Sequence, residues 1–214
     1  MNRAGIAERV ARGYGIAARV VGDAYRIHRP SPTGIAIGAA TYVGEVFATF
    51  SDDLSFARRE RWGEVAKVAV LDLSRVAVGD YLTGAEGTFF VSALPAFGPP
   101  QVVACNRVLT VTRPSPGTAG DAYYGGDVRA AEVALLSGWP GAVVQAGGLA
   151  SADVGLPGDT RPPGWLIYLP ASASAQLRAS DVVEDDQTQP MRYIIGSAEE
   201  TDMGWRLRAQ QAVA

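Results

Sequence analysis

The hydrophobic pattern of the chain changes about thirty residues from its start. From Ile6 onward, apolar and aromatic side chains recur every three or four residues, the spacing that places them on one face of a helix. The positions are Ile6, Val10, Tyr14, Ala17, Val21, Ala24 and Tyr25. This spacing predicts a helix over residues 2–27. Arg29-Pro30 ends it near His28, because proline lacks an amide proton and disfavours helical geometry in the residue before it.

Glycine and arginine set the expected behaviour of this helix. Each internal glycine costs about 0.5 to 1 kcal/mol relative to alanine, so the helix is expected to need a surface to pack on. These glycines are Gly5, Gly13, Gly15 and Gly22. The arginines of this segment could pair with acidic groups on a partner or form a solvated face, and both interpretations stay open. The residues expected to contact a neighbouring protein are Arg9, Val10, Arg12, Tyr14, Ala17, Arg19, Val21 and Tyr25.

Beyond Gly34 the apolar residues form short runs rich in valine, phenylalanine, threonine and tyrosine, such as "ATYVGEVFATF", "TFFVSAL" and "QVVACNRVLTVT". Runs of this kind between glycine and proline turns are typical of strands. They predict a small barrel or sandwich over residues 34–112. Residues 113–127, rich in proline and glycine, are expected to be a linker, and residues 128–214 a second β unit. The predicted fold is therefore mainly β, with an N-terminal helix and linker over 1–33.

The tetrapeptide Arg-Pro-Ser-Pro occurs at residues 29–32 and again at 113–116, either as punctuation or as a proline-rich ligand for a partner. Separately, a shared plan suggests that the β units are related: Asp80 and Asp181 each precede a hydrophobic pair, a polar turn and an aromatic-led strand. Hairpins also resemble one another because turn chemistry permits few solutions, so a true repeat and a chance likeness both stay open. The tetrapeptides are expected to act as punctuation, ending the helix and separating the β units.

Composition and charge narrow the function classes. The 214 residues carry a formal net charge of −3, which disfavours a protein that tracks nucleic-acid phosphates. The single cysteine, Cys105, cannot form an intramolecular disulfide and gives no sign of an oxidising compartment. The sequence shows no signal-peptide pattern and no apolar run of membrane-spanning length. We expect a folded protein that does not bind nucleic acid in a sequence-specific way and does not associate with a membrane.

The sequence offers little catalytic equipment. His28 is the only histidine and is expected in the last helical turn, while Cys105, flanked by apolar residues, is expected to be a core thiol. The pair Asp52-Asp53 and the run Glu184–Gln189 are most simply turns, the latter solvated. We therefore expect no enzyme activity, no metal and no cofactor. The aromatic residues of the second half are expected to pack in the core or at an interface, and a ligand-binding platform is the alternative. These residues are Tyr123, Tyr124, Trp139, Trp165 and Trp205.

Several stretches resemble virion proteins of tailed bacteriophages. They cover about two thirds of the chain and include "ARGYGIAARVVGDAYRIHRPS", "GDYLTGAEGTFFVSALPAFGPPQVVACNRVLTVTRP", "LSGWPGAVVQAG", "LPGDTRPPGWLIYLPA" and "RYIIGSAEETDMGWRLRAQQA". The second of these is similar to the small barrels of head-tail joining proteins. Those proteins usually have one β unit, whereas two are predicted here.

The resemblance implies a structural component of the head-tail connector, the neck or the adjoining tail. Its implied partners are portal, connector or tail proteins and further copies of itself in a ring. It implies assembly in the host bacterial cytoplasm, location in the virion and no catalytic residues. An accessory module that decorates the capsid or binds a host-surface glycan is the alternative from another class.

Overall fold

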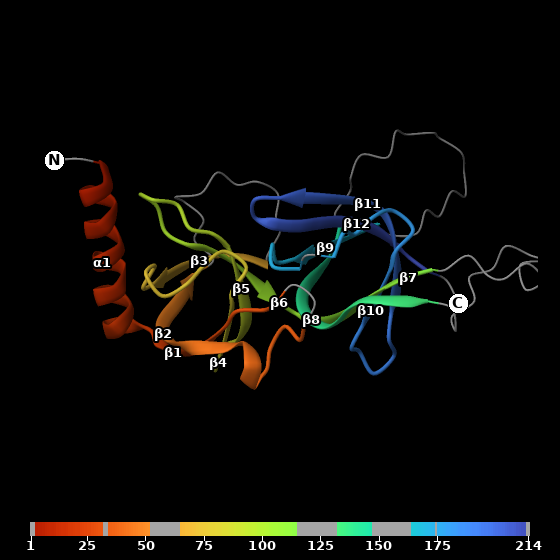
Figure 1. Cartoon of the computed structure of the whole chain (residues 1–214), viewed down its shortest axis with the longest axis horizontal. Helices are drawn as coiled ribbons and strands as arrows, with labels where there is room; N and C mark the ends of the chain where they lie inside the picture. Colours follow the sequence, from red (N-terminus) through yellow and green to blue (C-terminus); the bar gives the residue numbers. More distant parts are fainter. Residues whose placement is uncertain are drawn as a thin grey trace, which may run out of the picture.

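The computed structural model describes residues 3–31, 34–51, 65–114, 132–146, 164–173 and 175–212. Helix α1 (Arg3–Val21) is followed by two six-stranded antiparallel sheets, and the strand pairings close each sheet into a barrel. Figure 1 shows α1, the first barrel and the second barrel in succession along the long axis of the molecule. The predicted class, a helix followed by two small β units, is confirmed.

The two barrels have the same topology. In the first, the strand order is β1-β2-β3-β6-β5-β4; in the second it is β7-β8-β9-β12-β11-β10, so each strand has a counterpart six places later. The strands of the first barrel are β1 (Asp23–His28), β2 (Tyr42–Ser51), β3 (Ala66–Leu71), β4 (Tyr81–Gly84), β5 (Gly87–Ala93) and β6 (Gln101–Cys105). Those of the second are β7 (Arg107–Arg113), β8 (Val133–Gln145), β9 (Gly164–Leu169), β10 (Val182–Asp185), β11 (Arg192–Thr201) and β12 (Gly204–Gln211).

Matching hydrogen bonds support the view that the barrels are a tandem repeat. The Arg29 guanidinium donates to both carboxylate oxygens of Asp80 at 2.8 and 2.7 Å, and Arg113 does the same to Asp181 at 2.8 and 2.9 Å. Each aspartate lies directly before the fourth strand of its barrel, and a β-bulge interrupts the fifth strand at the same place in both. The arginine of each Arg-Pro-Ser-Pro copy therefore ties the end of a first strand to its barrel.

The predicted helix is too long. It ends at Val21, and residues 23–28 form β1, in which Tyr25 and Ile27 point into the first barrel and are buried. Gly22 makes the change of direction possible, because a Cβ atom there would lie 2.7 Å from the carbonyl carbon of Ala48. The spacing of Val21 and Tyr25 fits a helix, but the alternation within β1 decides the structure. His28 accordingly ends a strand rather than a helix.

The predicted boundary between the β units is also wrong. The structure pairs β7 with β8 and β10, so residues 107–113 belong to the second barrel. Strand β1, which was predicted to be part of the helix, belongs to the first barrel. The change of barrel occurs at Asn106, and the second Arg-Pro-Ser-Pro follows the first strand of its barrel. Of the linker predicted over 113–127, only Arg113 and Pro114 lie within the described residues.

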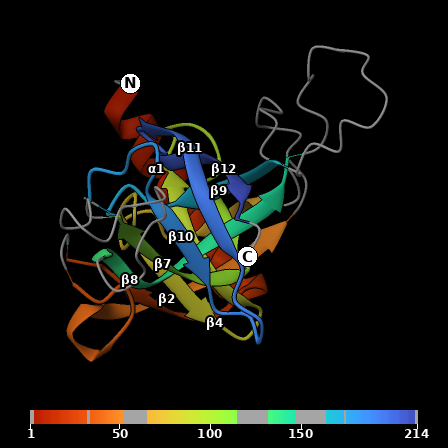
Figure 2. The same cartoon turned by 90° about the vertical axis from the view of Figure 1, so that its right-hand side faces the viewer.

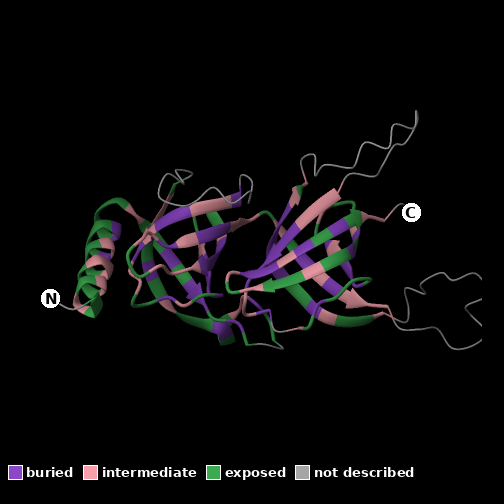
Figure 3. Cartoon of the chain, turned by 90° about the horizontal axis from the view of Figure 1, so that it is seen from above, coloured by how far each residue is buried: buried purple, intermediate pink, exposed green. Residues whose placement is uncertain are grey.

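The barrels share a buried junction. Asn106 exchanges two hydrogen bonds with the backbone of Val143, at 2.9 and 2.8 Å. The Tyr81 hydroxyl donates to the Pro140 carbonyl at 2.6 Å, and its ring meets Trp139 edge-on. Figure 3 shows buried residues as purple bands along the strands of both barrels. These contacts unite the two barrels in one body.

Candidate functional site

Helix α1 rests on the first barrel through small side chains. Gly15 and Ala18 are the buried residues of the helix, and α1 contacts β2 and β3. At Gly15 a Cβ atom would lie 3.3 Å from the Asp72 carboxyl carbon. Small residues at these positions let the helix approach the barrel closely. The larger apolar side chains of α1 therefore lie elsewhere on its surface.

The surface of α1 that points away from the barrel carries apolar residues together with the exposed Arg9. We call Ile6, Gly13, Ile16, Ala17 and Val20 the outer face of α1. On a helix with 3.6 residues per turn these positions share one side. Val20 is 79% exposed and Ile16 61%. Figure 2, which looks along the molecule from the other end, shows α1 beyond the barrels at the N-terminal end of the chain. Exposed aliphatic residues gathered on one face of a helix are typical of a contact surface.

The structure separates the predicted interface residues into three groups. Exposed residues of α1 are Arg9, Arg12, Ala17, Arg19 and Val21, and half-buried ones are Val10 and Tyr14. Tyr25 was predicted wrongly, because it lies in β1 with 1% of its surface exposed and packs edge-on against Phe50 and Phe89. It belongs to the core of the first barrel.

The sequence interpretation missed the two most telling residues of the outer face, Ile16 and Val20. The apolar stripe that it traced shares Ile6 and Ala17 with the outer face but continues through Val10, Tyr14 and Val21 onto a neighbouring side of the helix. Apolar residues on two sides of a helix indicate that both sides are covered by protein. In this chain the first barrel covers the inner side, and the outer side is exposed.

A groove runs between α1 and the first barrel. Its two hollows, of about 260 and 320 Å³, are both lined by Gly15, Arg19 and Asp72. Hydrogen bonding to Ser74 lowers the pKa of Asp72 despite the opposing effect of burial, and Arg75 and Arg19 lower it further. Asp72 is therefore an ionised partner for the arginine of the helix. The described residues that line the groove show no arrangement of reactive groups.

Gly13 provides a test of the outer face. No heavy atom of this chain lies within 4 Å of a Cβ atom built at Gly13, so the chain itself does not require glycine there. Gly13→Ala should stabilise the isolated protein by about 0.5 to 1 kcal/mol, because alanine has the higher helix propensity. Urea denaturation measures the gain. Gly15→Ala is the matched variant and should gain less or lose stability, since its methyl group meets Asp72.

The candidate reactive residues lie in structural settings. His28 is buried and its Nδ1 lies 3.3 Å from the Thr41 hydroxyl. Burial raises the pKa of the Cys105 thiol, which lies partly buried beside the junction core. Within the described ranges, no group of three or more His, Cys, Asp and Glu side chains is arranged to hold a metal ion. Asp52-Asp53 lie outside the described residues.

The three tryptophans pack in the core, as expected, and do not form the alternative ligand-binding platform among the residues described. Trp139 and Trp205 are 1% and 6% exposed, and the Trp205 indole donates to the Ala173 carbonyl at 2.7 Å. Trp165 is half-buried and its ring meets Tyr193 edge-on. These three side chains pack the second barrel. Tyr123 and Tyr124 lie outside the described residues.

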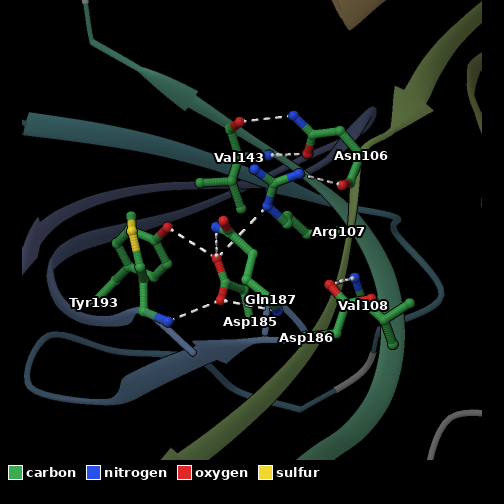
Figure 4. A network of polar contacts seen from close by, with 9 residues as sticks. Asn106, Arg107, Val108, Val143, Asp185, Asp186, Gln187 and Tyr193 are labelled. Carbon is green, nitrogen blue, oxygen red and sulfur yellow. Dashed lines mark hydrogen bonds and ion pairs between the residues drawn. The ribbon is translucent and has the colours of Figure 1, made fainter. Parts of the chain in front are cut away.

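The run Glu184–Gln189, predicted to be a solvated turn, contains a buried carboxylate. The Asp185 side chain is fully buried. It accepts hydrogen bonds from the Met191 amide at 2.8 Å, from the Gln187 side chain at 2.7 Å and from the Tyr193 hydroxyl at 3.1 Å. Arg107 lies 3.6 Å away, and Figure 4 shows these groups converging on Asp185. Asp185 thus organises the turn between β10 and β11, and only part of that turn is solvated.

This network predicts a pH dependence of stability. Burial acts to raise the pKa of Asp185, but the hydrogen bonds from Met191, Gln187 and Tyr193 outweigh it, and the pKa lies below its ordinary value of 3.8. The carboxylate therefore stabilises the fold above about pH 4, and this contribution disappears as the pH falls through the lowered pKa.

Asp185→Asn should lower the free energy of unfolding at pH 7 by about 1 to 3 kcal/mol, because a buried acceptor is lost. The difference in the free energy of unfolding between wild type and variant should become smaller from pH 5 to pH 2. Denaturation at each pH measures it. The exposed Asp202→Asn is the control and should leave the curve unchanged. A gap that stays constant with pH would show that Asp185 is not ionised in the folded protein.

Within the part of the chain that the structure describes, no helix has the length and apolar character needed to cross a membrane. No family model, curated protein or solved structure matches this chain.

Proposed function

We propose that this protein is a structural subunit of a tailed-phage particle, in the connector, the neck or the adjoining tail. In this role the two barrels form the rigid body of the subunit and α1 docks on a neighbouring protein. Further copies of the chain are among its partners, in a ring-like assembly. The protein performs no catalysis in this role.

The observation that carries the proposal is the exposed outer face of α1. Ile16 and Val20 project from a helix whose other side already rests on the first barrel. Burial of such residues contributes about 25 cal/mol for each Å² of apolar surface removed from water. Four arginines in α1, against one glutamate, add charges suited to an acidic neighbour.

The test is incorporation into particles. Phage particles produced with the gene for this chain are purified, and the protein is detected by mass spectrometry. The double variant Ile16→Asp/Val20→Asp should be absent from particles while remaining folded by circular dichroism. Val43→Asp, which changes an exposed residue of β2, is the control and should be incorporated normally. Particles that contain the double variant at the wild-type level, or no copy of the wild-type protein, would contradict the proposal.

A glycan-binding accessory module is less well supported. Its predicted platform depended on tryptophans that lie in the core of the second barrel. Selective binding on a glycan array that is lost in Trp165→Ala, with folding retained, would favour this alternative. Halo formation on peptidoglycan would favour an enzyme.

A further inference from the structure

The first barrel docks on the second through one face. Tyr81, Phe90 and Val103 lie on adjacent strands as cross-strand neighbours and have no exposed surface. They point out of the first barrel, because their neighbours along each strand, such as Phe89 and Val91, fill its interior. They join the buried cluster that contains Trp139 of β8. This face is the surface by which one repeat packs on the next.

The second barrel has a counterpart of this face. The equivalent aspartates, Asp80 and Asp181, place Val182, Ile194 and Gln210 at the positions of Tyr81, Phe90 and Val103, and Val182 and Gln210 both pair with Ile194. We call these three residues the terminal face. Val182 is only 4% exposed, and Gln210 is an exposed polar residue. Ile194, 45% exposed where its counterpart Phe90 is fully buried, is therefore the exposed apolar residue of the terminal face. The three residues of this face belong to β10, β11 and β12 of the second barrel, which follows the first barrel on the side away from α1 (Figure 1).

Helix α1 occupies the corresponding place at the other end. It lies on β2 and β3, the counterparts of β8 and β9, and borders Asp72 and Ser74 in the loop that follows β3. In the second barrel, β8 and the loop after β9 receive the first barrel, where the Ser172 hydroxyl donates to the Gly79 carbonyl at 2.8 Å. Each barrel thus receives the preceding part of the chain on the same side. A series of units packed front to back leaves an unpaired surface at each end.

Charge favours pairing between these two ends. Residues 1–21 carry four arginines and one glutamate, a formal charge of +3, whereas the described residues of the second barrel, from 107 to 212, carry six arginines and eight carboxylates, a formal charge of −2. Two copies of α1 packed on each other would bring like charges together, which is destabilising. An α1 helix on a second barrel brings opposite charges together.

We propose that the outer face of α1 docks on the terminal face of a second copy of this chain, so that copies associate head to tail. This inference rests on the proposed function and names the neighbour on which α1 docks. The contact is heterologous: it uses a different surface on each copy, so the copies close into a ring where the rotation between them permits and otherwise extend one by one. Within one chain, α1, the first barrel and the second barrel pack in that order. The proposed contact extends this order from one chain to the next.

Sedimentation velocity over a range of protein concentrations tests this proposal on the full chain. The wild type should form species larger than a dimer as its concentration rises. Val20→Asp and Ile194→Asp should each weaken self-association by about tenfold or more, because each buries a charge in an apolar contact. Val43→Asp should behave as the wild type. Circular dichroism verifies that every variant is folded.

Mixing the two defective variants gives the sharpest result. Ile194→Asp retains an intact outer face of α1, and Val20→Asp retains an intact terminal face. A one-to-one mixture should therefore form a heterodimer and nothing larger. Three results would overturn the proposal: a wild type that stays monomeric, an Ile194→Asp variant that associates as the wild type does, or a mixture that stays monomeric.

Failure of this inference is distinguishable from failure of the proposed function. Particles that exclude the Ile16→Asp/Val20→Asp variant but incorporate Ile194→Asp normally would show that α1 docks on a different protein. The structural role would then stand and head-to-tail docking would fall. Particles that incorporate both variants, combined with head-to-tail association in solution, would leave this inference standing and remove the proposed role of α1 in the particle.

Discussion

Gly204→Ala is expected to destabilise the protein by more than about 3 kcal/mol, the range of severe overpacking combined with backbone strain. Gly204 starts β12 with a φ of +125°, a conformation that side chains disfavour. A Cβ atom there would collide with the Leu169 carbonyl oxygen and lie 3.1 Å from the Ala171 amide nitrogen. Both are backbone atoms, one of the paired strand β9 and one of the turn that follows it, and they cannot turn aside as a flexible side chain can. Chemical denaturation measures the loss.

Gly87→Ala is the matched control for the collision. Gly87 has nearly the same φ, +123°, but no heavy atom lies within 4 Å of its Cβ position. This variant should show only the cost of backbone strain, about 1 to 2 kcal/mol. Equal losses in the free energy of unfolding for Gly204→Ala and Gly87→Ala would show that the close approach of β12 to Leu169 adds no cost beyond backbone strain.

Trp139→Ala is expected to lower the free energy of unfolding by about 3 to 5 kcal/mol, the usual cost of removing a buried tryptophan. The side chain is 1% exposed, and its ring centroid lies 6.3 Å from that of Tyr81 in the other barrel. Because the barrels share this cluster, both should lose stability and the variant should still unfold in one transition. Calorimetry measures the enthalpy and the number of transitions.

The exposed Val133→Ala, also on β8, is the control and should change stability by about 0.5 kcal/mol or less. Two separate transitions in the wild type would contradict the account of a shared junction. So would a Trp139→Ala protein in which only the second barrel is destabilised.

Some of the fold follows from the sequence. Alternation and turn residues predict two β units, and the likeness around Asp80 and Asp181 marks equivalent positions that the structure shows bound to Arg29 and Arg113. The extent of each barrel does not follow. A strand such as β1 has only six residues, and its spacing also fits the end of a helix. Which sheet a strand joins is decided by pairing between distant segments.

The candidate site was predicted in outline only. The spacing of apolar residues identified α1 and its need for a packing surface, but a helix has two sides, and the sequence does not say which of them its own barrel covers. Gly15 and Ala18 turned out to face the barrel. That choice leaves Ile16 and Val20 exposed. Tyr25 was misassigned because the helix was extended past Gly22.

The central claim is that another polypeptide covers the outer face of α1 in the assembled particle. A photo-crosslinking amino acid at Val20 tests it directly, with irradiation of purified particles and identification of the crosslinked peptides by mass spectrometry. We predict crosslinks between α1 and a second polypeptide chain, and within assemblies of this protein alone to peptides that contain Ile194. Irradiation that yields only uncrosslinked protein, or links confined to the same chain, would contradict the claim.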